Sequence, residues 1–447
     1  MFPRILLVCT TRWFATARLA KALVSAGARV EAVCPSDHPM AKMRSKPREY
    51  RFSALMPVRS ISKAIRAAQP DFVIPADDLA TDILHRIYHC AQSVGDVRTA
   101  DLIECSLGDA ANFAVTTSRS WLMAVAHDLG VRVPRTGVVT SAGELVQRLD
   151  DFGFPAVLKV DGTYGGRGVR IIRNASDANK AWPALSSPPS IARAAKRALV
   201  NRDMNYMLAC LRQARPVVNV QQFIGGFDAN STAACWRGRV VASVTVTVIR
   251  TLGDRGPSSV VRVINNEEMS ESIAKIASKL GLTGLFGFDF VVDTHTANPY
   301  LIELNPRATQ VCHLQLGQGR DLAASLSAAF SGAEIHSPSP STTNRVISLF
   351  PQEWLRDPRS EFLMATHHDV PWDEPEFIQL CIKEGSAHRL WDALSPAVEA
   401  ADRAFEKICR RVRRAAPEMS FKCGRQAELK RSNTPNHRAI VDSLGPK

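Results

Sequence analysis

The stretch that most constrains the fold is residues 286–313, which read FGFDFVVDTHTANPYLIELNPRATQVCH. This is the pattern of two apolar strands joined by a polar connector, in which Asn-Pro supplies the turn chemistry. The first strand carries one acid, Asp289, and the second carries Glu303, with Asn305 two residues further on the same face. A carboxylate in an apolar strand is costly to bury unless a neighbouring group neutralises it. Two carboxylates and an amide on adjacent strands suit Mg²⁺ or Mn²⁺, which keeps other positions for water and phosphate.

For either acid alone, the alternative is a hairpin whose carboxylate is solvated or paired with a basic side chain. The combination of GFDF with YLIELNPR, however, resembles the metal-binding hairpin of the ATP-grasp enzymes, in the carboxylate–amine ligase branch. The resemblance implies that Asp289, Glu303 and Asn305 hold Mg²⁺ against the phosphates of ATP. It also implies that Arg307 contacts the transferring phosphate or the substrate.

Two basic residues and a glycine-rich segment upstream fit the same resemblance. Lys159 lies in the apolar strand PAVLKV and needs an anion, which a nucleotide phosphate would provide. The following GTYGGRG allows backbone N–H groups to close over phosphates, and it is not a Walker A loop because no G-K-[ST] follows. Arg119 opens a helix at a position where the family usually carries Lys, and it would donate to phosphate as a planar fork. The glycines expected at the nucleotide are Gly162, Gly165, Gly166 and Gly168.

The segment VVNVQQFIGGFD matches the strand and hinge that receive adenine and ribose in the family. Gln221 and Gln222 stand where an acid and a neighbouring polar residue are common, and a glutamine can still offer its carbonyl to the adenine amino group. The backbone of Phe223 and Ile224 would pair with the adenine edge. Asp228 stands where a Glu often binds the ribose hydroxyls.

The N-terminal part alternates strand and helix patterns, which predicts a parallel sheet with crossover helices. Strands are expected at 4–9, 29–34 and 71–75. The first strand is followed by CTTRWFAT, without G-x-G-x-x-G, so this part is Rossmann-like but lacks the NAD fingerprint. DFVIPADD resembles the segment of the family's N-terminal domain that faces the active site. Asp77 and Asp78 therefore lie where ligands usually bind, although a helix N-cap explains them equally well.

These patterns predict an α/β protein that is α+β in its ATP-grasp part. We expect a Rossmann-like pre-ATP-grasp domain at 1–115 and a two-subdomain ATP-grasp domain at 116–335, with inserted basic helices at about 180–215. After a Ser-Pro linker, residues 342–395 should form a small C-terminal appendage, in which HHDVPWDEP is expected to be a packed Pro-rich turn and not a metal site. Residues 415–447 are predicted to be a basic, mostly disordered tail.

Charge and cysteine usage limit the partners. The net charge is +13, but residues 191–215 and 402–431 carry +5 and +6 of it, so the basicity belongs to appendages and argues against a nucleic-acid-binding core. No apolar run approaches the roughly 18 residues that span a bilayer, and the apolar run near the N-terminus is too short for a signal peptide. The ten cysteines include no C-x-x-C pair, so we expect reduced thiols in a cytoplasmic protein without a membrane partner.

The function that this pattern predicts is Mg²⁺-dependent joining of a small-molecule carboxylate to an amine. ATP would activate the carboxylate as an acyl phosphate, which the amine attacks to give an amide, ADP and phosphate. Arg250 and Arg255 lie in a loop that lines the acceptor pocket in the family, so they are candidates for the substrate carboxylate, and exposed loop arginines are an equal alternative.

A second class stays open, namely an ATP-binding regulatory or scaffold protein with an ATP-grasp fold that has lost ligase activity. The departures at Arg119 and Gln221 favour it, whereas the complete metal set with Arg307 favours the ligase. Association into a homo-oligomer is compatible with either class.

Overall fold

The computed structural model describes residues 3–161, 168–187, 216–253, 256–332, 334 and 339–384. Met1–Ala393 form one compact unit, and the second unit, Leu394–Lys447, lies outside the described residues. The predicted tail at 415–447 is therefore not described. Of the predicted basic insertion at about 180–215, only the first residues are described, and they belong to helix α8 (Ala175–Ser186).

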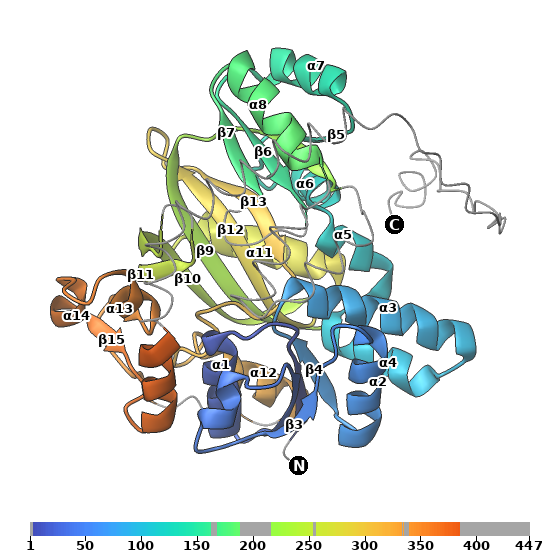
Figure 1. Cartoon of the computed structure of the whole chain (residues 1–447), viewed down its shortest axis with the longest axis vertical. Helices are drawn as coiled ribbons and strands as arrows, with labels where there is room; N and C mark the ends of the chain where they lie inside the picture. The colour runs from blue at the N-terminus through green and yellow to red at the C-terminus, as the bar shows by residue number, and fades with distance from the viewer. Residues whose placement is uncertain are drawn as a thin grey trace, which may run out of the picture. The chain divides into compact units, whose positions relative to one another are not determined.

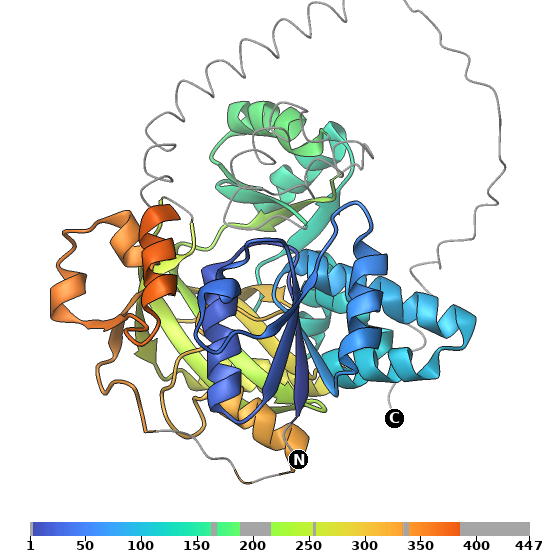
Figure 2. The same ribbon diagram turned by 60° about the horizontal axis from the view of Figure 1, so that its bottom comes forward.

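The N-terminal sheet is parallel, with the strand order β3-β2-β1-β4. The inner strand β1 and the edge strand β4 are almost continuously apolar because helices cover both faces, whereas the opposite edge strand β3 reads REYR and is largely exposed. Helices lie on both sides of this sheet (Figure 2). Ile5 and Leu7 pack with residues of α1, whereas Leu6 and Val8 pack with residues of α2, α3 and α4. The Rossmann-like prediction is confirmed. The elements are β1 (Arg4–Val8), α1 (Phe14–Ser25), β2 (Arg29–Cys34), η1 (Pro39–Lys42), β3 (Arg48–Arg51), α2 (Pro57–Ala68), β4 (Phe72–Pro75), α3 (Asp78–Val94) and α4 (Val97–Leu107).

A small sheet follows, in which four antiparallel strands have the order β5-β8-β6-β7. One face is apolar and packs against α7 and α8 (Figure 1). The opposite face carries Lys159, Asn219 and Gln221, since residues two apart on a strand share a face. The elements from η2 onward are η2 (Ala110–Asn112), α5 (Phe113–Thr117), α6 (Arg119–Asp128), β5 (Thr136–Val139), α7 (Ala142–Phe152), β6 (Ala156–Val160), β7 (Val169–Ile172), α8 and β8 (Val218–Gln222).

The central sheet has seven strands in the order β13-β12-β9-β10-β11-β14-β15, and all neighbours are antiparallel except β14 and β15. One face packs on α6 and α11, and the other packs on α12 and the N-terminal sheet. The two antiparallel sheets that follow the Rossmann-like part confirm the predicted fold class. The elements are β9 (Gly226–Trp236), β10 (Arg239–Thr251), β11 (Ser258–Ile264), α11 (Glu267–Leu280), β12 (Gly284–Asp293), β13 (Pro299–Asn305), α12 (Leu322–Ser331), β14 (Val346–Leu349), α13 (Gln352–Arg356), α14 (Phe362–Ala365) and β15 (His367–Asp369).

The segment expected at 342–395 as a small appendage contributes β14 and β15 to the central sheet. The expectation that HHDVPWDEP forms only a turn is wrong at its start, because His367–Asp369 form β15. Asp369 is buried and ties this strand to distant parts of the chain. Arg18 of α1 donates to its carboxylate at 2.6 Å, and His313 Nε2 lies 2.7 Å from its other oxygen. Burial opposes ionisation, yet Arg18 and His313 hold the pKa of Asp369 well below its usual range.

Among the described residues, none of the helices combines the length and the apolar character needed to cross a bilayer.

We expect Asp369→Ala to lower the free energy of unfolding by about 3–5 kcal/mol, because it leaves Arg18 buried without its counter-ion. Asp373→Ala is the matched control: this carboxylate pairs with Lys21 but is 63% exposed, so its removal should cost about 1 kcal/mol or less. Because the folded-state pKa of Asp369 is depressed, its contribution is present above the unfolded pKa of about 3.9 and is lost as pH falls. Urea unfolding at pH 7 gives both values, and equal losses in the two variants would contradict the account.

Candidate functional site

Two acids on neighbouring strands form the centre of the candidate site. In the antiparallel β12–β13 ladder Asp289 lies directly opposite Glu303, and on its other side it lies opposite Asn230 of β9. Asn230 Nδ2 donates to Asp289 Oδ1 at 2.5 Å, and Asn305 Nδ2 donates to Asp289 Oδ2 at 3.1 Å. The three residues predicted to hold a metal ion therefore lie together on one face of the central sheet.

The two carboxylates are electrostatically coupled. Burial, together with the nearby Glu303, raises the pKa of Asp289 to about 6, and the amides of Asn230 and Asn305 oppose this rise. A divalent cation would relieve the repulsion, and two carboxylates with one amide oxygen are suitable ligands for Mg²⁺. No cluster of three His, Cys, Asp or Glu residues suited to a metal ion occurs within the described ranges, so a cation here would need the amide, water or phosphate as further ligands.

Lys159 supplies a buried positive charge on the polar face of the small sheet. Its side chain makes no hydrogen bond or ion pair with any described residue, although the residue is only 6% exposed. Burial lowers the pKa of Lys159 to about 8, although the nearby Glu303 favours the charged form. A buried ammonium group that makes no ion pair with any described residue is costly to keep charged, so this position is suited to an anionic ligand.

Arg119 is the first residue of α6, which Ser118 caps through a hydrogen bond from the backbone N–H of Trp121. Its guanidinium lies between two acids: Nη1 donates to Asp161 and Nη2 to Glu303, each at 2.5 Å. Arg119 Nε is buried and has no hydrogen-bond partner within the described part of the chain. Asp161 follows β6 and also accepts a hydrogen bond from Asn219 of β8, at 3.0 Å.

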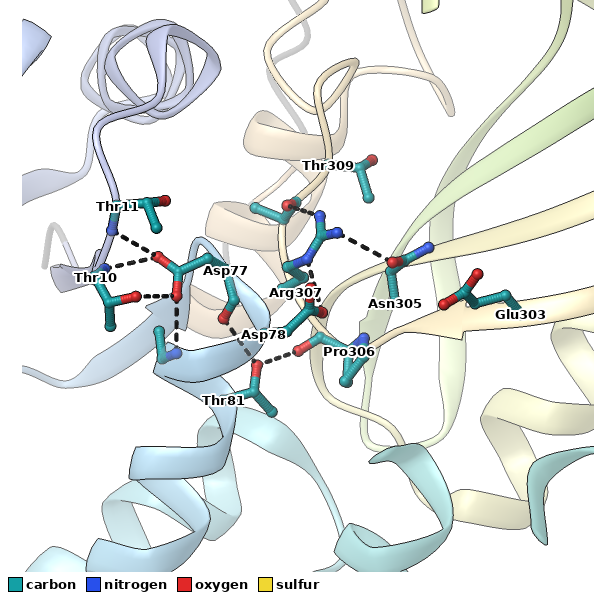
Figure 3. A network of polar contacts seen from close by, with 12 residues as sticks. Thr10, Thr11, Asp77, Asp78, Thr81, Glu303, Asn305, Pro306, Arg307 and Thr309 are labelled. Carbon is teal, nitrogen blue, oxygen red and sulfur yellow. Dashed lines mark hydrogen bonds and ion pairs between the residues drawn. The ribbon is translucent and has the colours of Figure 1, made fainter. Parts of the chain in front are cut away.

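Arg307 follows β13 and meets the N-terminal sheet (Figure 3). Its Nε donates to Asp78 at 2.9 Å and its Nη2 donates to Asn305 Oδ1 at 3.1 Å. Thr81 of α3 donates to the Pro306 carbonyl at 2.8 Å. The guanidinium is therefore fixed beside the predicted metal ligands by Asp78, the first residue of α3 in the N-terminal part of the chain.

The structure distinguishes between the two interpretations of Asp77 and Asp78, namely a helix N-cap and residues that face the site. Asp77 is the N-cap of α3, where it accepts from Ala80 N, and it also accepts from the backbone and hydroxyl of Thr10, each at 2.6 Å (Figure 3). Asp77 is thus occupied by structural contacts. Asp78 instead presents its carboxylate to Arg307.

The loop that carries Arg307 lies close against the central sheet because β12 has a glycine there. A Cβ at Gly287 would lie 2.4 Å from Thr309 Cγ2. Thr309 also lies 2.7 Å from the hydroxyl of Thr232 on β9. A side chain at Gly287 would therefore displace this loop.

The two glutamines expected near adenine are placed differently. Gln221 is buried and its Nε2 donates to Thr136 at 3.0 Å, which leaves its carbonyl as an acceptor. Gln222 accepts from the backbone N–H of Arg135 at 3.4 Å.

Phe223 and Ile224 directly follow β8 and are half-buried. Asp228 lies opposite Val291 in the β9–β12 ladder, two residues before Asn230, so it shares the face that carries the acids.

Other predicted residues are not brought into this cluster. Arg250 lies over the ring of Phe362 at 5.5 Å and donates to the carbonyl of Ile249. No hydrogen bond or ion pair joins it to the acids within the part of the chain that the structure describes. Gly168 accepts from the backbone of Val160. Gly162, Gly165, Gly166 and Arg255 lie outside the described residues.

Sequence analysis missed three residues of the cluster, namely Asn230, Asp161 and Asn219. Each has a signal of period two: Asn230 follows Asp228 by two residues, Asp161 follows Lys159 by two, and Asn219 precedes Gln221 by two. Residues two apart on a strand share a face, so a polar residue at this spacing could have been assigned to the site.

Comparisons with known proteins agree with this geometry. The family model "Carbamoyl-phosphate synthase L chain, ATP binding domain" matches residues 119–314. The arginine-specific large chain of carbamoyl phosphate synthase from Geobacillus stearothermophilus is 27% identical over 229 residues, which are 49% of this chain and 20% of the relative. The formate-dependent phosphoribosylglycinamide formyltransferase of Synechocystis sp. is 24% identical over 262 residues, 56% of each chain. The chain thus spans between a fifth and somewhat more than half of these curated relatives.

Solved structures show the same fold at low identity. Carboxyaminoimidazole ribonucleotide synthase from Aspergillus clavatus, complexed with ATP, superposes with a TM-score of 0.55 and 13% identity, over 76% of this chain and 79% of that one. The biotin carboxylase domain of Hydrogenobacter thermophilus 2-oxoglutarate carboxylase, in complex with MgADP and bicarbonate, gives 0.53 and 15%, over 76% and 72%.

We expect ATP binding at pH 8 to take up protons on Lys159, because burial keeps its pKa near 8 and a polyphosphate would raise it. Calorimetry in buffers of different ionisation enthalpy measures this uptake. Lys159→Arg should bind ATP without the uptake, since arginine stays charged. Lys159→Ala should lose more than about tenfold in affinity, a difference of 1.4 kcal/mol, with a thermal midpoint near that of the parent. An alanine variant with parental affinity would contradict the assignment.

Proposed function

Because the chain belongs to the ATP-grasp superfamily, we propose that it is an ATP-dependent ligase that activates a carboxylate as an acyl phosphate and joins it to an amine. The observation that carries the proposal is the cluster of Asp289, Glu303 and Asn305, with Arg307 beside it. A protein that only binds nucleotide has no need for a guanidinium fixed next to the site of phosphoryl transfer.

In this proposal Asp289, Glu303 and Asn305 hold a magnesium ion. The bound ion would neutralise charge on the ATP phosphates and orient them. The chemistry of the donor set fits, since the two carboxylates and the Asn305 amide carry oxygen ligands, and burial and the neighbouring Glu303 raise the pKa of Asp289. Asn305 Oδ1 accepts from Arg307 while its Nδ2 faces Asp289, so the amide would have to turn its oxygen toward the ion.

In the first step, an oxygen of the substrate carboxylate attacks the γ-phosphorus of ATP. The bond from the γ-phosphorus to the bridging oxygen of the β-phosphate breaks, and ADP leaves. Such transfers depend on positioning and charge neutralisation, which Lys159 and Arg119 would provide from the small-sheet side of the site. No nucleophile from the protein is required.

In the second step, the amine nitrogen attacks the acyl carbon, the bond from that carbon to the phosphate oxygen breaks, phosphate leaves, and the nitrogen loses a proton to the departing phosphate or to solvent. Negative charge grows on the carbonyl oxygen during this attack, and Arg307, which donates to the predicted metal ligand Asn305, is the cation that would stabilise it. Its contacts to Asp78 and Asn305 hold it in one orientation, so little reorganisation is needed in the transition state.

One observation favours the second class, an ATP-binding regulatory or scaffold protein. Arg119, which stands where the family usually has Lys, is held by Asp161 and Glu303 and is therefore not free for phosphate in this conformation. ADP release separates the two classes. A screen of amino acids and dicarboxylates with amines should reveal release that requires both partners, whereas a regulatory protein would bind ATP without it.

With the acid and the amine that the screen identifies, Arg307→Ala should lower kcat by roughly a hundredfold or more and change ATP affinity little, because it acts on the transition state. Arg250→Ala should mainly raise KM if this residue grips the substrate carboxylate. Arg132→Gln is the surface control, since Arg132 pairs with Glu268 in solvent. Steady-state kinetics and ATP titration decide, and an Arg307 variant with the kcat of the Arg132 control would overturn its role.

Glu303→Gln tests the metal ligands. It should remove Mg²⁺-dependent turnover while the circular dichroism spectrum and the thermal midpoint stay close to those of the parent, since the side chain keeps its size and loses its charge. Turnover at the parental rate would show that Glu303 is not a ligand.

A further inference from the structure

Arg119 connects the two sheets that enclose the candidate site. Its acceptor Asp161 directly follows β6 of the small sheet, and its acceptor Glu303 lies on β13 of the central sheet. The Arg119 side chain is only 7% exposed, and both contacts measure 2.5 Å. A planar guanidinium can meet two carboxylates at once in this way, with one terminal nitrogen for each.

The contact with Glu303 has a consequence for cation binding. Glu303 is one of the two acids assigned to the metal ion, and its Oε1 is already engaged by Arg119. A divalent cation that approaches Glu303 in the absence of nucleotide therefore competes with a positive charge that is already in place. The same charge stabilises the pair Asp289 and Glu303 when no cation is bound.

Asn219 supports the contact between Arg119 and Asp161. Asp161 Oδ1 accepts from both Arg119 and Asn219 Nδ2, so the amide fixes the carboxylate. Asn219 is fully buried, and neither its Oδ1 nor the buried Arg119 Nε has a hydrogen-bond partner among the residues that the structure describes. Asp161 and Asn219 could thus keep the guanidinium in the site after Glu303 releases it, with Nε still able to donate to an anion.

We propose that Arg119 is an exchangeable counter-ion, which neutralises Glu303 in the empty site and moves to the nucleotide phosphates when metal and nucleotide bind together, while Asp161 and Asn219 act as positioning residues. The inference deepens the proposed function and rests on its metal and nucleotide sites. It predicts that a free divalent cation binds weakly and that nucleotide and cation favour each other's binding, since the nucleotide removes the competitor from Glu303.

Binding of Mn²⁺ alone, followed by electron paramagnetic resonance, tests the competition without nucleotide or turnover. Arg119→Gln should bind Mn²⁺ more tightly than the parent. Lys159→Gln is the control, because it removes a nearby positive charge that interacts with Glu303 through space, whereas Arg119 donates a hydrogen bond to it. The gain in Arg119→Gln should exceed the gain in Lys159→Gln by at least about fivefold. Equal gains, or no Mn²⁺ binding in any variant, would overturn the inference.

Calorimetric measurement of ADP binding without metal tests the same exchange with the nucleotide in place of the cation. Glu303→Gln should bind metal-free ADP more tightly than the parent, because Arg119 is then free for phosphate. Asp289→Asn removes an equivalent charge that makes no hydrogen bond to Arg119, so its gain should be smaller by about fivefold or more. A gain in Asp289→Asn as large as that in Glu303→Gln would reduce the effect to general electrostatics and contradict the exchange.

The two arms also separate this inference from the proposed function. If the parent protein releases no ADP with any acid and amine, the ligase proposal fails, yet the Mn²⁺ comparison still reports on Arg119. If ADP release is found but Arg119→Gln and Lys159→Gln bind Mn²⁺ alike, the ligase proposal stands and the exchange fails.

Discussion

The structure depends on a pair of acids that the β12–β13 ladder sets side by side. Asp289 and Glu303 are direct partners on neighbouring strands, and burial together with mutual repulsion raises the pKa of Asp289. Positive charge or hydrogen-bond donors must approach this pair from each side. In the structure, Arg119 and the two asparagine amides do so. Of these contacts, the one from Arg119 also joins the two antiparallel sheets around the site, since its other acceptor, Asp161, follows β6 of the small sheet.

The N-terminal sheet enters the same network at its carboxyl edge. Asp77, between β4 and α3, accepts from Thr10 in the loop that follows β1 and so fixes the position of the next residue, Asp78. Asp78 in turn holds Arg307. The N-terminal domain lacks a nucleotide-binding fingerprint of its own, yet through Asp78 it determines the orientation of the Arg307 guanidinium in the central site. In the ligase that we propose, this sheet would control the acyl-transfer step and the small sheet would control the nucleotide.

Much of the fold and of the candidate site could be predicted from the sequence, because side chains alternate between the two faces of a strand with a period of two. The acids Asp289 and Glu303, the buried Lys159 and the order of the sheets follow from apolar runs interrupted by single polar residues. The partners of those residues could not be predicted. Asp161 and Arg119 are 42 positions apart, and their meeting depends on how α6 enters between two sheets. The C-terminal strand β15 was missed because three residues, His367–Asp369, are too few to give a periodic pattern.

The central claim is that Asp289, Glu303 and Asn305 bind a metal–nucleotide complex, with Lys159 on the phosphates. A crystal structure with Mg²⁺ and a non-hydrolysable ATP analogue tests it most directly. The account predicts a cation at about 2.0–2.1 Å from oxygen atoms of Asp289 and Glu303, and phosphate oxygens within hydrogen-bond distance of Lys159 Nζ. A nucleotide bound elsewhere, or a cation held by phosphates alone with both acids still engaged by Arg119 and the asparagines, would contradict it.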